Sequence, residues 1–160
     1  MRYALSFSDL PTGASADTFK TLALLILANT AGHRFRVRSL QVGPADDAPA
    51  DLNVAVRLAR TDNSGAATGG TAIAAASVQK KDSLSRDTVA SARTGPTAEP
   101  TTYETNAPFQ MDFNIRSGLM KEWDELSAPI VNSNQTLGLL AAPRTAVAIR
   151  LSGTIEYEEF

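Results

Sequence analysis

The fold is indicated by a stretch in the first half of the chain, Leu52-Asn53-Val54-Ala55-Val56-Arg57-Leu58-Ala59. Large apolar side chains occupy every second position, and polar or small residues lie between them. Because successive side chains of a strand point to opposite faces of a sheet, this alternation predicts a β-strand with one face in a core. A second stretch repeats the pattern with Phe109, Met111, Phe113 and Ile115.

Further strands are expected on both sides of these two. The same alternation predicts strands within residues 3–7, 34–42, 88–92, 137–141 and 147–157, the last with a kink at Gly153. In 34–42 the apolar phase shifts by one residue, which predicts a β-bulge near Arg38-Ser39. Short strands separated by turn-forming residues are typical of an antiparallel sandwich or barrel, so we expect residues 1–160 to form a single all-β domain.

In three segments the pattern does not follow the simple alternation of a strand, and a helix has to be considered. Residues 19–28 are apolar on both faces, which favours a central strand covered on both sides, although leucine and alanine also favour a helix. Residues 71–78 are rich in alanine and fit either a strand or a short helix. Residues 118–126 are the best candidate for a helix, because four apolar residues there gather on one helical face, namely Leu119, Met120, Trp123 and Leu126.

Composition excludes several classes of function. The 15 basic and 17 acidic residues give a net charge of −2, whereas a nucleic-acid-binding protein needs a basic surface to neutralise phosphates. The absence of cysteine excludes disulfides and thiolate metal sites. The longest apolar run, residues 22–28, is too short to span a bilayer, and the first residues lack a signal-peptide pattern. We therefore expect a soluble protein that binds neither nucleic acid nor membrane.

The residues that catalysis or metal binding would need are sparse. His33 is the single histidine, and a triad or zinc site needs further partners around it. Asp46, Asp47 and Asp51 could bind calcium through their carboxylates, or could simply be loop and strand-flanking residues. A glycosidase needs two opposed carboxylates, such as Asp112 with Glu104, but the sequence gives no reason to prefer that pair. We expect no enzyme and no cofactor, and a hydrolase on a β scaffold is the remaining alternative.

Charged residues gather on two of the predicted strands. Three arginines, Arg34, Arg36 and Arg38, recur at every second position, either as an interface or as a solvated strand face. Near the end of the chain, Glu156 and Glu158 share one strand face and are followed by Glu159. These acidic residues could pair with the arginines within one chain or between copies of it.

Two large aromatic residues complete the candidate contacts. Phe160 could dock into a neighbouring molecule or cover the edge of the sandwich, and Trp123 could lie in the core or in an interface. The predicted interface therefore consists of Arg34, Arg36, Arg38, Glu156, Glu158, Glu159 and Phe160.

The layout of the chain resembles a family of virion proteins. The resemblance lies in the order of several segments, namely Phe35-Arg36-Val37-Arg38-Ser39-Leu40 after Asn29-Thr30, then Gly69-Gly70-Thr71-Ala72, Lys80-Lys81-Asp82-Ser83, Ala92-Arg93-Thr94-Gly95-Pro96-Thr97 and Gly153-Thr154-Ile155-Glu156-Tyr157-Glu158-Glu159. This order is similar to that of small decoration or cement proteins, also called head auxiliary proteins, of tailed bacteriophages.

The resemblance implies a jelly-roll sandwich that binds the major capsid protein on the outer surface of the head, commonly as a homotrimer. Such proteins stabilise the capsid against the pressure of packaged DNA, so the expected location is the virion exterior after assembly in the bacterial cytoplasm. The family has no active site to carry over. An alternative from another class is a carbohydrate- or receptor-binding sandwich of a virion or tail.

Overall fold

The computed structural model describes residues 1–28, 32–46, 51–62, 68–82, 86–100 and 102–160. These residues form two antiparallel sheets that pack face to face, as predicted for an all-β sandwich. Sheet 1 contains, in order, β10 (Ile130–Asn132), β3 (Arg34–Pro44), β12 (Arg150–Glu159), β1 (Arg2–Pro11) and β6 (Gln79–Lys80), with β9 (Leu119–Glu122) also pairing β3. Sheet 2 contains β5 (Thr71–Ile73), β7 (Ser91–Thr94), β2 (Lys20–Ile26), β11 (Gln135–Pro143), β4 (Asn53–Asp62) and β8 (Phe109–Asn114).

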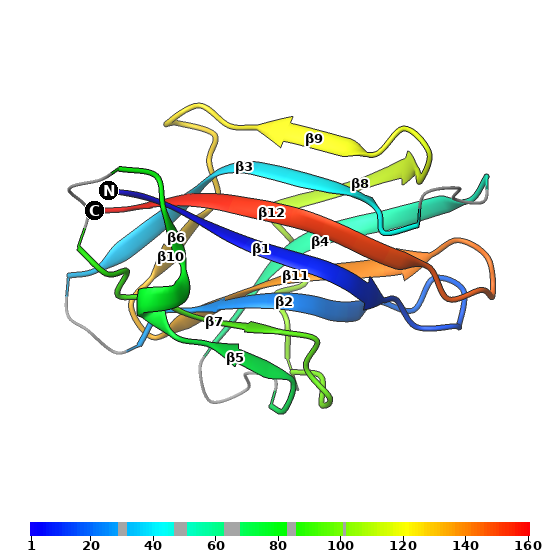
Figure 1. Cartoon of the computed structure of the whole chain (residues 1–160), viewed down its shortest axis with the longest axis horizontal. Coiled ribbons are helices and arrows are strands. Elements are labelled where there is room, and N and C mark those ends of the chain that lie inside the picture. The colour runs from blue at the N-terminus through cyan, green and yellow to red at the C-terminus, as the bar shows by residue number, and fades with distance from the viewer. Residues whose placement is uncertain (29–31, 47–50, 63–67, 83–85, 101) are drawn as a thin grey trace.

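The connections between the strands follow a jelly roll. Sheet 1 has the order β1-β12-β3-β9 at its centre, and sheet 2 has β2-β11-β4-β8. The chain passes from one sheet to the other between β1, β2, β3 and β4, and again between β8, β9, β11 and β12. This is the arrangement that the resemblance implied. Figure 1 shows strands of both sheets running along the long axis, with both termini at the same end.

The core lies between the sheets and is formed by the side chains that point inward from the strands of both sheets. At the end of the core near the chain termini, three aromatic rings from sheet 1 meet: Tyr3 stacks on Tyr157 at 5.5 Å, and Phe35 approaches Tyr157 at 5.3 Å. All three side chains are fully buried. Burying a large side chain contributes about 1.5–3 kcal/mol each, so the alternation seen in the sequence directly stabilises the sandwich.

Two of the finer expectations are confirmed. Residues 20–26 form a strand and no helix, buried on both faces as predicted. The bulge predicted near Arg38-Ser39 is also present, because the pairing of β3 with β12 shifts register between Val37 and Ser39. Arg38 is the additional residue, and it restores the apolar phase at Leu40.

The helix expected at 118–126 does not form. Leu119–Glu122 is instead the strand β9, which pairs with β3 from Ser39 to Val42. Leu119 and Trp123 are buried while Leu126 is fully exposed, so the apolar residues follow strand alternation and not a helical face. Of the ambiguous segment 71–78, Thr71–Ile73 is a strand and Ala75–Ser77 a single 3-10 turn. In the described parts of the chain no helix is long and apolar enough to cross a membrane.

The described residues of the crossing segment, 95–100 and 102–108, cover part of the outer face of sheet 2. Glu99 accepts hydrogen bonds from the backbone N–H of Thr21, at 3.0 Å, and from its hydroxyl. The Tyr103 hydroxyl lies 2.9 Å from that of Thr21, and its ring packs directly over Gly138, where a Cβ would fall 2.3 Å from the Tyr103 oxygen. Burial raises the pKa of the Tyr103 phenol above its usual value. The described crossing residues therefore act as a fixed cover.

Candidate interaction surface

The outer face of sheet 1 carries the predicted arginines and acidic residues. Arg36 lies directly opposite Glu158 of β12 on one side and Ile130 of β10 on the other. The next pair towards the end of the sheet is Arg34 with Phe160, joined by two backbone hydrogen bonds of 3.2 and 3.0 Å. The sheet therefore brings together side chains from β3, early in the chain, and from β10 and the C-terminal residues, late in the chain.

Arg36 is the centre of this group. Its Nε donates to Glu158 at 3.1 Å, its Nη2 lies 3.4 Å from Glu125, and its guanidinium lies 4.9 Å from the centre of the Phe160 ring. Arg38 approaches the same two carboxylates at 3.7 and 4.0 Å. The arginines and Glu158 thus pair within one chain. Partly exposed ion pairs contribute about 0–1 kcal/mol each, so this network orients the side chains more than it stabilises the fold.

A rigid turn after β9 adds two residues that the sequence did not single out. Asp124 accepts hydrogen bonds from the N–H groups of Leu126 (2.9 Å) and Ser127 (2.8 Å) and from the Ser127 hydroxyl (2.8 Å). These bonds, the Ser127 N–H first, hold the pKa of the Asp124 carboxyl below its usual value. The turn places Glu125 against the arginines and leaves the side chain of Leu126 100% exposed. Asp is a common turn-forming residue, so Asp124 two residues before Leu126 is the local signal that could have identified this turn in the sequence.

Three exposed apolar side chains surround the charge network. Leu126 is joined by Phe160, 52% exposed, and Ile130, 36% exposed. Exposed apolar side chains around charged groups that pair with one another are typical of protein-binding surfaces. We name this group the Arg36 patch, and it consists of Arg36, Arg38, Glu125, Leu126, Ile130, Glu158 and Phe160.

The other predicted interface residues lie elsewhere. Glu156 pairs with Lys81 at 2.8 Å, further along the same face. Arg34 is exposed beside Phe160. Glu159 points to the opposite side of β12 and is only 7% exposed, where its carboxylate accepts from the backbone N–H groups of Val89 and Ala90. Strand alternation turns this side chain inward, and its part in an interface stays a prediction.

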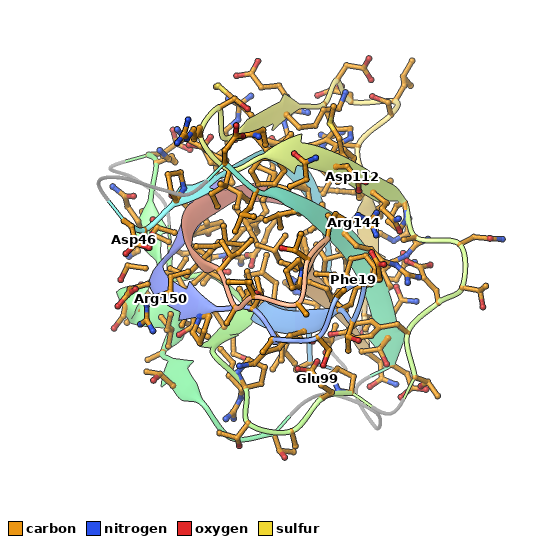
Figure 2. The ribbon with its side chains drawn as sticks, turned by 90° about the vertical axis from the view of Figure 1, so that its right-hand side faces the viewer. Phe19, Asp46, Glu99, Asp112, Arg144 and Arg150 are labelled. Atoms are coloured by element: carbon orange, nitrogen blue, oxygen red, sulfur yellow. The ribbon has the colours of Figure 1, made fainter. Side chains whose placement is uncertain are left out.

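The candidate carboxylate pair for glycoside hydrolysis is not assembled. Asp112 is bound by Arg144 in a two-pronged ion pair at 2.7 and 2.9 Å, which Figure 2 shows at one end of the sandwich. Glu104 is bound by Arg60, whose Nη2 lies 2.8 Å from it. Each carboxylate already has a cationic partner of its own, and the two do not face a common cavity among those the structure describes.

The candidate calcium ligands and the histidine do not form a centre either. Asp46 and Asp51 are exposed, Asp51 is bound by the Asn114 amide, and Asp47 lies outside the described residues. Across the described residues no group of three or more acidic or histidine side chains is placed to hold a metal ion. His33 is half-buried and lines a hollow of about 380 Å³ together with Arg86 and the chain termini. Trp123 lies in the core, edge-on to Phe109 at 5.2 Å.

Comparisons of this chain with protein-family models, with curated proteins and with solved structures find no match.

Proposed function

We propose that this chain is a virion structural protein that decorates the outer surface of a tailed-bacteriophage capsid. In this proposal it binds the major capsid protein, associates with itself as a homotrimer, and stabilises the head from outside. The observation that carries the proposal is the Arg36 patch, where exposed Leu126, Ile130 and Phe160 surround a network of ion pairs. The layout resemblance supplies the kind of partner.

The architecture supports a structural role of this kind. A decoration protein has to present the same surface to many identical neighbours without changing shape, since closed symmetry repeats each contact. The sandwich has long paired strands, and the Asp124 hydrogen bonds fix the turn that presents Leu126. Little conformational entropy is then lost when the surface is covered, which favours affinity.

Co-sedimentation with undecorated capsids that carry the cognate major capsid protein tests the proposal. We expect the wild-type chain to pellet with the capsids and to be a trimer by light scattering. Leu126→Asp places a charge where an apolar contact is expected, and we expect a loss of capsid binding of about tenfold or more. Because Leu126 is fully exposed, its free energy of unfolding should stay within about 0.5 kcal/mol of wild type.

A charge reversal and a matched control complete the experiment. Arg36→Glu should weaken assembly more than folding, because Arg36 lies on the outer face of the sheet. The control is Val147→Asp, an equally apolar position, 51% exposed, next to the start of β12 and so at the other end of that strand from Phe160. A wild-type chain that stays monomeric and in the supernatant contradicts the proposal. Equal losses for Leu126→Asp and Val147→Asp contradict the assignment to the Arg36 patch.

A further inference from the structure

A trough runs along the outer face of sheet 1, beside the Arg36 patch. Its larger part has a volume of about 550 Å³ and a smaller adjoining hollow has about 240 Å³. Four residues line both parts, so the two hollows form one continuous depression; these are Ser6, Gln41, Met120 and Thr154. The size falls within the range of about 300–1,000 Å³ that is usual for ligand sites.

The floor of the trough is a row of side chains from four adjacent strands. Met120 of β9 lies opposite Gln41 of β3, Gln41 opposite Thr154 of β12, and Thr154 opposite Ser6 of β1. Ser6 and Thr154 share a hydrogen bond of 3.0 Å. All four side chains are neutral. Those of Ser6, Gln41 and Thr154 can both donate and accept hydrogen bonds, whereas Met120 is apolar.

Several polar side chains that line the trough have no hydrogen-bond partner among the described residues. Within the described residues, the side chains of Gln41, Ser39 and Gln79 make no hydrogen bond. The Arg36 patch differs, because its charged groups already pair with one another. The trough therefore offers neutral hydrogen-bonding groups to a ligand, whereas the neighbouring patch is charged.

The charges around the trough cancel. Arg116 and Glu122 lie on its border, and Lys81 and Glu156 form an ion pair of 2.8 Å beside it. Two positive and two negative groups give no net charge, so neither an anionic nor a cationic ligand is favoured. An uncharged ligand rich in hydrogen-bonding groups fits the lining best.

The pairing of the strands argues against a peptide ligand. An extended peptide usually binds by adding a strand to a free sheet edge. At Gln41 both edges of β3 are occupied, one by β9 and the other by β12. Recognition at Gln41 must therefore use side chains. Met120, 69% exposed, adds an apolar surface suited to the C–H face of a sugar ring.

We propose that this trough binds a neutral carbohydrate, with Gln41 and Thr154 as hydrogen-bonding residues and Met120 as the apolar contact. This site is separate from the capsid-binding role proposed above and does not depend on it. The proposed contacts involve no metal: the larger hollow has no carboxylate in its lining, and in the smaller one Glu156 is paired with Lys81.

The test is a glycan array carrying neutral and acidic oligosaccharides, followed by isothermal titration calorimetry with the best ligand. We expect saturable binding to neutral glycans, retained in EDTA. Gln41→Ala should weaken binding by about tenfold, since one or two hydrogen bonds are lost. The matched control is Gln110→Ala on β8, which is equally exposed but belongs to sheet 2 and lies outside the trough.

Four outcomes would overturn the proposal. They are no neutral glycan bound above background, a preference for acidic glycans or for peptides, loss of binding in EDTA, and equal affinity of wild type and Gln41→Ala. Because Gln41 is exposed, Gln41→Ala should unfold at the wild-type denaturant midpoint, so a folding defect would not be mistaken for a binding defect. Leu126→Asp should bind glycan like wild type, which separates this site from the Arg36 patch.

Discussion

The outer faces of the two sheets differ although the same strand alternation builds both. On the central strands of sheet 2 several outward-facing side chains are apolar or small and are fully or almost fully buried, as for Leu24, Ala59 and Leu140, whereas the edge strand β8 leaves its outward-facing polar side chains exposed. On sheet 1 the outward-facing side chains are polar or charged, and they are open to solvent along β3 and β12. One face is thus a second, smaller core, and the other is a surface available for contacts.

The difference arises from the crossing segment 95–108. It is polar in sequence, yet three of its side chains fix it to sheet 2: Glu99 on Thr21, Tyr103 over Gly138, and Glu104 on Arg60. The polar residues of the crossing segment thus hold it on sheet 2 by hydrogen bonds, and the apolar side chains of the sheet are buried beneath it. A strand that is apolar on both faces therefore indicates a cover, even where the covering segment itself does not look like core.

The difference between the two faces is tested most directly by truncating one apolar side chain on each of them. Leu24 is completely buried under the cover, and Leu24→Ala should lower the free energy of unfolding by about 2–5 kcal/mol through lost burial and a cavity. Met120→Ala on the open face should change it by less than about 0.5 kcal/mol. Denaturant unfolding followed by tryptophan fluorescence measures both. Similar losses for the two variants would show that the open face is itself covered.

A smaller effect is expected when the anchor of the cover is removed. In Glu99→Ala the buried N–H and hydroxyl of Thr21 lose their acceptor, which should cost about 1–3 kcal/mol. The control is Glu122→Ala, an exposed carboxylate on β9 of the open sheet. Amide hydrogen exchange should show faster exchange at Thr21 and on β11 in Glu99→Ala alone. Unchanged exchange and unchanged stability would mean that Tyr103 and Glu104 hold the crossing without Glu99.

Most of the fold could be predicted because it depends on local alternation. Clean period-two patterns identified β4 and β8, and a shift of phase in β3 located the bulge at Arg38. Residues 118–126 could not be assigned in this way, since the spacing of Leu119, Trp123 and Leu126 fits one face of a helix. The edge of β3 decides the outcome by pairing with β9, and that partner lies about 80 residues away in the sequence.

The surface was predictable only in part, for the same reason. Arginines on one strand and glutamates on another suggested an ion-pair network, and the structure joins Arg36 to Glu158. Alternation alone should have turned Glu159 inward, since Glu156 and Glu158 face out. Glu125 and Leu126 could not be placed, because their position depends on a turn closed by Asp124 and on the neighbouring strand β3.

The smallest expected effect concerns the turn closed by Asp124 on the outer face of sheet 1, and it tests whether the Asp124 carboxylate holds that turn. The ionised Asp124 carboxylate accepts the N–H groups of Ser127 and Leu126, so its pKa in the folded chain lies below the usual value of about 3.9. Any stabilisation of the turn is then complete above the usual pKa and is lost as the pH falls through the lowered one. Carboxyl-detected NMR titration should show Asp124 titrating below that value, and the amide shifts of Leu126 and Ser127 should follow the same curve. In Asp124→Asn this step should vanish, and a titration of Asp124 at the ordinary value would show that the turn presenting Leu126 is not held by its carboxylate.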